Sequence, residues 1–309
     1  MKSGELLSDA ESAYLKKAME ARKGEPPARN NTTPGDGSDE KATVAPVIIS
    51  EEASPIKTLK VTASDGNRIE FAYRPPMAGR PLPAIVFIHG SLGQSRIREL
   101  KESARSNLTH TRFLSAGYVA VAATFRTYVN EPVSRGPVLD LIAIVQEVQK
   151  LPEVDPDSVV IFGTSGGGSI ALELAASDEV SFPAVVIREP ATVLYTGLMT
   201  DLSMRDKSMK EYATLYNDER RKATEAKIAG ISCPLLVHHG DRHLLKNISF
   251  DIVFPAIEAA GKTLVIKRYP VEDHGFYWGN RTSEATVDLV VANTREFIEP
   301  LLKSKPAAQ

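Results

Sequence analysis

Ser165, Asp241 and His274 are the residues whose types and order suggest nucleophilic chemistry. Ser165 is the central residue of a G-x-S-x-G sequence at 163–167, and Asp241 and His274 follow it in the order serine, acid, histidine. A serine hydroxyl attacks a carbonyl carbon when a nearby base accepts its proton, and an acid holds that base in the correct tautomer. The order therefore predicts Ser165 as nucleophile, Asp241 as acid and His274 as base.

The residues around Ser165 strengthen this prediction. An apolar, β-branched run at 159–162 precedes the motif, and an alanine-rich helical segment follows it. A serine on a sharp strand-to-helix turn is held in a strained backbone conformation, and side chains at Gly163 and Gly167 would crowd it. The turn also places the backbone N–H of Gly166 at a helix N-terminus, where negative charge is favoured. The pattern is typical of a nucleophile elbow.

The acid and the base are each expected at the end of a strand. Asp241 ends an apolar strand, and His274 lies in the loop after a strand at 263–269. Glu189 is a rival for the acid, because it ends the preceding strand at 184–188. We favour Asp241 over Glu189, and we expect Asp273, beside the histidine, to be an ordinary loop carboxylate.

These motifs resemble those of the α/β-hydrolase superfamily, in particular the branch that holds dienelactone hydrolases and the catalytic domains of prolyl oligopeptidases. The resemblance covers roughly residues 56–303. It rests on Ser64-Asp65-Gly66-Asn67, His89-Gly90, Gly163-Thr164-Ser165-Gly166-Gly167-Gly168, His239-Gly240-Asp241 and Asp273-His274-Gly275-Phe276.

The resemblance implies the same nucleophile, acid and base. It also implies that the backbone of Gly166 and of Ser91, just after His89-Gly90, forms the oxyanion hole. The chain departs from both relatives. Dienelactone hydrolases use a cysteine where this chain has Ser165, and 309 residues leave no room for the large N-terminal propeller of prolyl oligopeptidases.

The pattern of the whole chain predicts an α/β fold, the α/β-hydrolase fold, with a mostly parallel sheet covered by helices on both faces. Two strands joined around Asp65-Gly66 form a hairpin, and strands and helices alternate after it. The strands are expected at 57–63, 68–73, 84–89, 119–125, 159–162, 184–187, 234–239 and 264–268.

The chain divides into two predicted regions. Residues 1–55 combine a short amphipathic helix with a polar linker rich in proline and glycine, and residues 56–309 form the catalytic domain. Within that domain, the long connection at 191–232 is either a small helical cap over the active site or an ordinary crossover helix. The pattern leaves both alternatives open.

Residues near the predicted strand ends are candidates for binding substrate. Arg126 and Tyr128 follow the strand at 119–125, and Tyr277 and Trp278 follow the histidine. Each of the four is also explained by ordinary loop or packing roles.

A metal site deserves consideration because His238, His239 and His243 lie close together in the sequence. Adjacent histidines on a strand point to opposite faces and cannot easily chelate one ion. We therefore expect neither a metal nor a cofactor.

Composition sets limits on partners and compartment. The formal net charge is −2, so nothing favours nucleic acid or an acidic membrane surface. The single cysteine, Cys233, excludes an internal disulfide and is expected to be a buried thiol.

No apolar run is long enough to span a bilayer. The start of the chain has no signal-peptide core, which predicts a cytoplasmic protein, or a secreted or periplasmic one whose signal has been removed. Oligomeric state has no sequence signal.

The sequence thus predicts a serine hydrolase that forms an acyl-enzyme on a small-molecule substrate. A carboxylic ester with a small or short acyl group is the preferred substrate. Two alternatives stay open: a peptidase or amidase of prolyl oligopeptidase type with the same triad, and a catalytically silent α/β-hydrolase fold used for binding.

Overall fold

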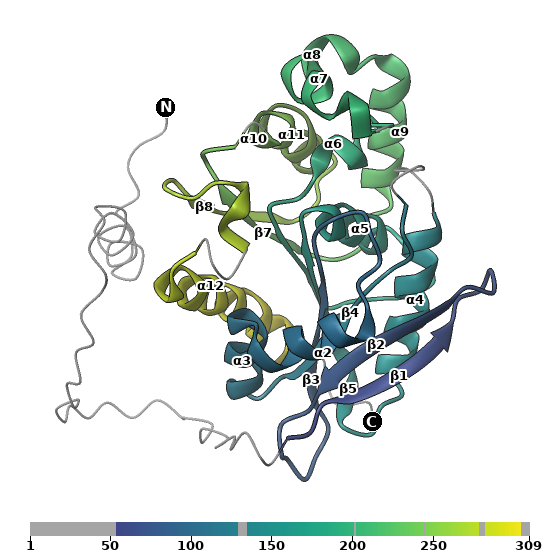
Figure 1. Cartoon of the computed structure of the whole chain (residues 1–309). Helices are drawn as coiled ribbons and strands as arrows, with labels where there is room; N and C mark the ends of the chain where they lie inside the picture. Colours follow the sequence, from purple (N-terminus) through teal and green to yellow (C-terminus); the bar gives the residue numbers. More distant parts are fainter. Residues whose placement is uncertain (1–53, 129–134, 201, 244, 278–281, 304–309) are drawn as a thin grey trace, which may run out of the picture.

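The computed structural model describes residues 54–128, 135–200, 202–243, 245–277 and 282–303 (Figure 1). The helix and linker predicted in the N-terminal region lie outside these residues. In the described part of the chain, eight strands form one sheet in the order β1-β2-β4-β3-β5-β6-β7-β8. Their bounds are β1 Lys57–Thr62, β2 Arg68–Arg74, β3 Leu82–Ile88, β4 Val119–Ala123, β5 Val154–Thr164, β6 Val185–Arg188, β7 Leu235–Gly240 and β8 Leu264–Tyr269.

The sheet has a short antiparallel part and a long parallel part. β1 and β2 pair as an antiparallel hairpin, and β2 pairs antiparallel with β4. Gly66 forms the turn of that hairpin with a φ of 89°, a conformation that glycine adopts without strain. The pairs from β4 to β8 are all parallel. Parallel strands end at the same edge of a sheet, so the loops after β3, β5, β6, β7 and β8 lie close together.

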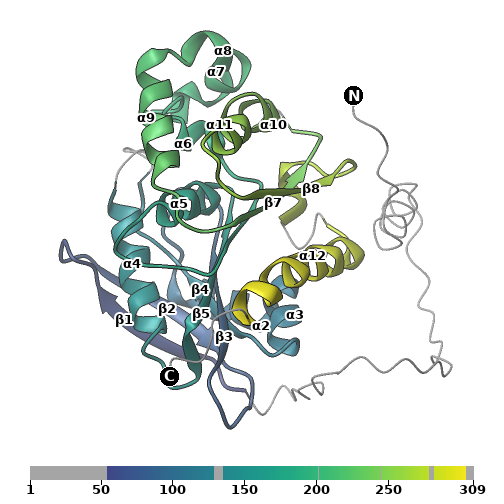
Figure 2. The ribbon, with the colours of Figure 1, turned by 180° about the vertical axis from the view of Figure 1, so that it is seen from behind.

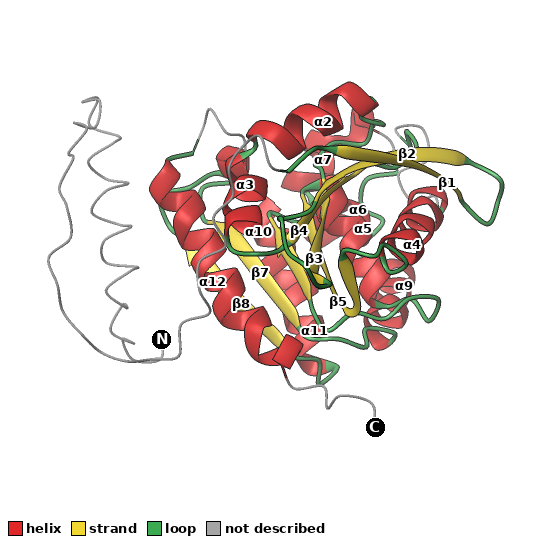
Figure 3. Ribbon diagram, turned by 90° about the horizontal axis from the view of Figure 1, so that it is seen from below, coloured by secondary structure: helices red, strands yellow, loops and turns green. Residues whose placement is uncertain are grey.

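Helices cover both faces of the sheet, as Figures 1, 2 and 3 show from three directions. α2, α3 and α12 pack on one face, and α4, α5, α9 and α11 pack on the other. The helix bounds are α2 Ile97–Ser106, α3 Leu108–Ser115, α4 Gly136–Val148, α5 Gly166–Ala175, α6 Thr192–Tyr195, α7 Arg205–Lys210, α8 Tyr212–Leu215, α9 Asp218–Ala229, α10 Leu245–Ile248, α11 Phe254–Ala259 and α12 Glu284–Lys303, with the turns η2 Leu202–Met204, η3 Ser249–Val253 and η4 His274–Tyr277.

The central strands alternate their side chains between two cores. On β3, Val86 and Ile88 belong to the core under α4 and α5, whereas Ile85 and Phe87 belong to the core under α3 and α12. Successive side chains of a strand point to opposite faces, so a strand that is buried on both faces has to be apolar throughout. This arrangement confirms the predicted mostly parallel sheet with helices on both faces.

The connection at 191–232 consists of α6, η2, α7, α8 and α9. In Figure 1 these helices gather above α5, beyond the edge at which the parallel strands end. α9 ends with Ile228 packed in the core under α4 and α5, while most of the side chains of α7 are exposed to solvent. Among the described helices, none is long and apolar enough to cross a membrane.

Candidate active site

Ser165 lies at the turn from β5 into α5, where its backbone is strained. Its φ is 52° and its ψ is −116°, a combination that residues other than glycine rarely adopt. A Cβ atom on Gly163 would come within 2.5 Å of the Gly167 carbonyl oxygen, and one on Gly167 would collide with the His89 carbonyl oxygen. The two flanking glycines are therefore required by close backbone approach, as the sequence predicts.

A chain of hydrogen bonds links Ser165 to a buried carboxylate. The Ser165 Oγ lies 2.9 Å from the Nε2 of His274, which is the first residue of η4. The Nδ1 of the same ring lies 3.0 Å from the Oε2 of Glu189. Because a carboxylate only accepts, the proton of the neutral imidazole belongs on Nδ1, which leaves Nε2 free to accept the serine proton.

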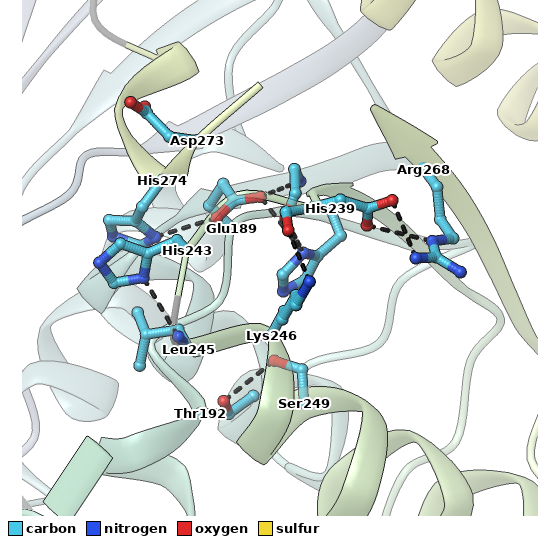
Figure 4. A network of polar contacts seen from close by, with 12 residues as sticks. Glu189, Thr192, His239, His243, Leu245, Lys246, Ser249, Arg268, Asp273 and His274 are labelled. Carbon is cyan, nitrogen blue, oxygen red and sulfur yellow. Dashed lines mark hydrogen bonds and ion pairs between the residues drawn. The ribbon is translucent and has the colours of Figure 1, made fainter. Parts of the chain in front are cut away.

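Glu189 is held in place from several sides. Its backbone N–H donates to the carbonyl oxygen of His238 on β7 (2.9 Å). Its Oε1 accepts a hydrogen bond from the backbone N–H of Gly240 and lies 3.5 Å from the Nδ1 of His239. The side chain of Glu189 is completely buried. Figure 4 shows this carboxylate between His239 and His274.

Asp241 does not meet His274, so the prediction that it is the acid of this chain is wrong. Its carboxylate accepts hydrogen bonds from Arg268 on β8, from Nε at 3.1 Å and from Nη2 at 2.8 Å. Its carbonyl oxygen accepts from the Nζ of Lys246 at 2.8 Å. Arg268 pairs in register with His239, so a basic residue lies near the end of the neighbouring strand, β8. Arg268 is visible in the sequence, but only the register of β7 and β8 places it beside Asp241 rather than Glu189.

Backbone strain marks the same site. Among the described residues, the non-glycine residues with positive φ are Ser91 at 84°, Ser165 at 52° and Glu189 at 53°. Such conformations cost roughly 1–3 kcal/mol each and persist only where the surrounding structure enforces them. Here the N–H of Ser165 donates to the Arg188 carbonyl oxygen, and the N–H of Ala191 donates to the Ser165 carbonyl oxygen (3.0 Å each). The elbow and the acid-bearing turn are thus bound directly to each other.

The residues predicted for the oxyanion hole lie beside Ser165. Gly166 is the first residue of α5, so its N–H has no partner within the helix. Ser91 lines the same pocket as Ser165 and Gly166. A Cβ atom on Gly166 would collide with the Ser91 carbonyl oxygen and approach the Tyr128 hydroxyl to 3.2 Å. That hydroxyl is buried without a hydrogen-bond partner among the described residues.

His89 supports the loop that carries Ser91. Its Nδ1 lies 2.6 Å from the Gly90 carbonyl oxygen, and its Nε2 lies 2.8 Å from the Thr124 Oγ1. Thr124 also accepts a hydrogen bond from the backbone N–H of Ser95. Both ring nitrogens of His89 are therefore occupied in holding the loop together, which gives this histidine a structural role.

Burial shifts the pKa values of both titratable groups in the chain. It lowers the pKa of His274 to about 4 and raises the pKa of Glu189 to about 7. His239, the backbone N–H of Gly240 and the positive charge of Arg188 oppose the rise in the pKa of Glu189, because each favours the carboxylate. A neutral His274 can accept the serine proton, and the Glu189 carboxylate stabilises the imidazolium that results.

A pocket of about 380 Å³ opens at Ser165. His243, His274 and Arg205 contribute polar groups to its lining, together with Ser91. The other side chains are apolar, and most come from the 191–232 segment: Leu92, Ala191, Val193, Leu194, Met199, Leu202, Met209 and Leu245. A larger cavity of about 510 Å³ lies between α2, α3 and the start of α12, and Ser165, Glu189 and His274 do not line it.

Arg126 is not a pocket residue, which corrects a second expectation. Its guanidinium is held by the carboxylates of Asp65, in the β1–β2 turn, and of Asp140, in α4. The pair with Asp65 fastens the loop after β4 to the hairpin, and the pair with Asp140, whose side chain is fully buried, fastens it to α4. The position of Trp278 lies outside the described residues, and of Tyr277 only the backbone, at the end of η4, is described.

The three clustered histidines point in different directions. His238 bonds to the hydroxyls of Tyr269 and Thr294, His239 faces Glu189, and His243 faces the pocket. Among the described residues, no group of histidine, cysteine, aspartate and glutamate could hold a metal ion. Cys233 is buried, and burial raises the pKa of its thiol to about 11, so it is protonated and unreactive.

The fold and the site together define the class of protein. The strained serine at the elbow, the histidine after β8 and the buried carboxylate after β6 occupy the edge where the parallel strands end. This is a serine hydrolase with an α/β-hydrolase fold. The profile of the prolyl oligopeptidase family matches residues 117–299, more than half of the chain. The chain belongs to that family, which confirms the predicted branch.

Three known proteins illustrate the range of its relatives. The quorum-quenching protein AidA of Acinetobacter baumannii (strain MDR-ZJ06) is 26% identical over 237 residues, which are 72% of this chain and 73% of AidA. The structure of esterase Est22 superposes with a TM-score of 0.58 at 16% identity, covering 82% of this chain and 81% of Est22. The Pyrococcus horikoshii acylaminoacyl peptidase gives a TM-score of 0.59 at 16% identity, over 83% of this chain and 43% of the peptidase.

Proposed function

We propose that this serine hydrolase cleaves carboxylic esters of small molecules through an acyl-enzyme. The observation that carries the proposal is the continuous hydrogen-bond chain from Glu189 through His274 to Ser165, which ends at the mouth of a mainly apolar pocket. The described residues that line this pocket include no aspartate or glutamate. A free, charged peptide amino terminus is commonly bound by such a carboxylate, whereas a small ester needs none.

The reaction follows from the placement of the groups. His274 accepts the proton of Ser165 on Nε2 while the serine oxygen bonds to the ester carbonyl carbon. The negative charge that forms on the carbonyl oxygen is placed toward the backbone N–H groups of Gly166 and Ser91. When the C–O bond breaks, the imidazolium returns its proton to the alcohol that leaves. Water then repeats the sequence on the acyl-enzyme and releases the acid and free Ser165.

The segment at 191–232 is proposed to act as a cap that sets the size of the substrate. It supplies Val193, Leu194, Met199, Leu202 and Met209 to the wall of the pocket. A pocket of about 380 Å³ is near the small end of the usual range for ligand sites. It suits a short acyl or alcohol group better than a long lipid chain.

The decisive experiment compares wild-type protein with Ser165→Ala. A fluorophosphonate probe should label the wild type at Ser165 and leave the variant unlabelled, and turnover of p-nitrophenyl butyrate should fall by several orders of magnitude. Undiminished labelling of the variant would remove Ser165 from the mechanism.

The same assay separates esters from peptides. The value of kcat/KM for p-nitrophenyl acetate and butyrate should exceed that for p-nitrophenyl palmitate and for alanyl- and prolyl-p-nitroanilide. Faster cleavage of either anilide would instead establish the peptidase alternative, which uses the same residues and is represented among the structural relatives. Faster cleavage of the palmitate would contradict the size limit set by the cap.

A further inference from the structure

A second histidine borders the catalytic pocket without joining the chain from Ser165 to Glu189. His243 lies in the loop between β7 and α10, and its ring centroid is 4.8 Å from that of His274, with the two planes tilted by 32°. Both rings line the pocket that contains Ser165. Figure 4 shows the His243 ring between His274 and Leu245. The ring of His243 is thus a polar part of the wall of the pocket that contains Ser165.

The hydrogen bonding of His243 defines which nitrogen carries its proton. Its Nδ1 accepts a hydrogen bond from the backbone N–H of Leu245 at 3.1 Å. In a neutral imidazole one nitrogen accepts and the other donates, so the proton is on Nε2. Burial and the neighbouring His274 lower the pKa of His243 to about 4, so the ring is neutral at neutral pH. His243 is therefore a donor at Nε2, on the side of the ring away from Leu245.

Described residues on both sides of His243 are held by hydrogen bonds and an ion pair. Asp241, before it, is bound to Arg268, and Lys246, after it, donates to the Asp241 carbonyl oxygen. The N–H of Arg242 donates to the Glu272 carbonyl oxygen at 3.1 Å. A donor whose neighbours are held in this way loses little conformational entropy when it binds a ligand. Asp241 thus serves the site indirectly, by holding the loop of His243.

Few other polar side chains line the described part of this pocket. Apart from Ser165, Gly166 and His274, the described polar residues of the lining are Ser91, Arg205 and His243. Arg205 lies near enough for its positive charge to help lower the pKa of His243. The pocket therefore combines apolar walls with a polar side formed by His243 and by Arg205, whose Nε also donates to Asp206 at 3.1 Å. This combination fits an apolar group that carries an oxygen acceptor.

We infer that His243 is a specificity-determining residue whose Nε2–H donates a hydrogen bond to an oxygen of the substrate. The substrate class is an ester in which the group that occupies the pocket has an ether, carbonyl or hydroxyl oxygen within a few atoms of the scissile bond. A site with a placed donor discriminates against the analogue that lacks the acceptor, because the donor is then buried without a partner. The inference rests on the proposed ester hydrolysis and names the substrates within it.

Two pairs of isosteric esters test the inference. In each pair one methylene group is replaced by an ether oxygen: p-nitrophenyl butyrate against p-nitrophenyl methoxyacetate in the acyl group, and butyl acetate against 2-methoxyethyl acetate in the alcohol group. The readout is the ratio of kcat/KM for the ether to kcat/KM for the alkyl ester. Intrinsic reactivity contributes equally to this ratio in every variant, so only changes between variants are interpreted.

His243→Phe keeps an aromatic ring beside His274 and removes the donor. The ratio should fall by roughly 3- to 10-fold for the pair whose varied group enters the pocket, which is the range of one neutral hydrogen bond. His243→Gln keeps a side-chain N–H and an acceptor for Leu245, and should restore part of the ratio. Arg242→Gln alters the exposed neighbour on the same loop and should leave both ratios at their wild-type values.

The outcomes separate this inference from the proposed function. If the wild type and His243→Phe are both labelled by the fluorophosphonate and both ratios change by less than twofold, the inference is overturned and ester hydrolysis stands. A fall in His243→Phe that His243→Gln does not reverse also overturns it, since that loss follows from the shape of the ring rather than from the donor. If the wild type cleaves none of the four esters, the proposed function itself fails.

Discussion

Two neighbouring strands end in a carboxylate, and only one of the two reaches the histidine. Glu189 follows β6 and Asp241 follows β7, and these strands pair in register up to Arg188 and His238. Glu189 is fully buried with its Oε2 3.0 Å from the Nδ1 of His274. Asp241 is bound to Arg268, whose side chain is 56% exposed. The two carboxylates thus occupy equivalent positions after neighbouring strands, but one contacts the catalytic histidine and the other stabilises a loop.

The difference arises from backbone conformation and from partners. The φ of 53° at Glu189 turns the chain sharply at the strand end, and the N–H of Gly240 and the ring of His239 receive its carboxylate in the interior. Asp241 directly follows the last residue of β7, where Arg268 on β8 offers a bidentate partner. A buried carboxylate with fixed donors is pre-organised for catalysis, whereas a half-exposed ion pair contributes little beyond local order.

Of the substitutions at the two carboxylates, removal of the Glu189 charge is expected to lower activity most. Glu189→Gln keeps the shape of the side chain but disfavours the tautomer that leaves Nε2 of His274 free, so kcat should fall by roughly 10⁴-fold, as in serine-protease triads. The measurement is kcat for p-nitrophenyl butyrate, with Asp241→Asn as the matched control. If Asp241→Asn lost more activity than Glu189→Gln, the acid would belong on β7 after all.

A smaller loss of activity is expected when the backbone N–H that binds the Glu189 carboxylate is displaced. A Cβ atom on Gly240 would lie 2.7 Å from the Glu272 carbonyl oxygen, so Gly240→Ala should shift the N–H that holds the carboxylate. A misplacement of about 1 Å costs on the order of 10²-fold in rate.

Gly79→Ala is the control for that experiment, because a Cβ atom there meets nothing within 4 Å. Circular dichroism should confirm that both variants fold. Full activity in a folded Gly240→Ala would show that the contact from Gly240 does not position the acid.

The dependence of kcat/KM on pH is an independent test of the role of the Glu189 carboxylate. Protonation of His274 removes the base, and protonation of Glu189 removes the charge that supports it, so kcat/KM should fall as the pH falls. The acid limb should lie between about 4 and about 7, the pKa values to which burial brings the two groups, and it belongs to the pair rather than to either residue.

In Glu189→Gln that limb should move to lower pH, because the imidazolium loses its stabilising charge. The residual rate of the variant, measured from pH 4 to pH 9, checks this. A limb that stays at the wild-type position would indicate that another group controls it.

The smallest effect is expected at Asp241. Asp241→Asn and Arg268→Met each break an ion pair that is partly exposed, so the free energy of unfolding should fall by at most about 1 kcal/mol. Activity should fall less than tenfold, through the loop that carries His243. Urea unfolding of both single variants and the double variant gives the coupling energy, and a loss of several kcal/mol would contradict a mainly surface ion pair.

The sequence alone determined the elements and their order in this protein. The apolar runs at 84–88 and 159–162 specify buried parallel strands, and the glycines around Ser165 specify a tight turn into a helix. These patterns are local, because side-chain periodicity and glycine content act within a few residues of chain. Ser165 and His274 were predictable for the same reason, since each sits in a motif that the neighbouring residues define.

Only the tertiary structure decided which groups meet. Glu189 and Asp241 both end a strand, and no local pattern states which carboxylate faces His274 and which faces Arg268. That choice depends on a positive φ at Glu189 and on the side-by-side register of β6, β7 and β8, which bring together residues far apart in the sequence. The engagement of Arg126 by two carboxylates was decided in the same way. Side-chain partners are set by packing in three dimensions, and a linear pattern carries no such distances.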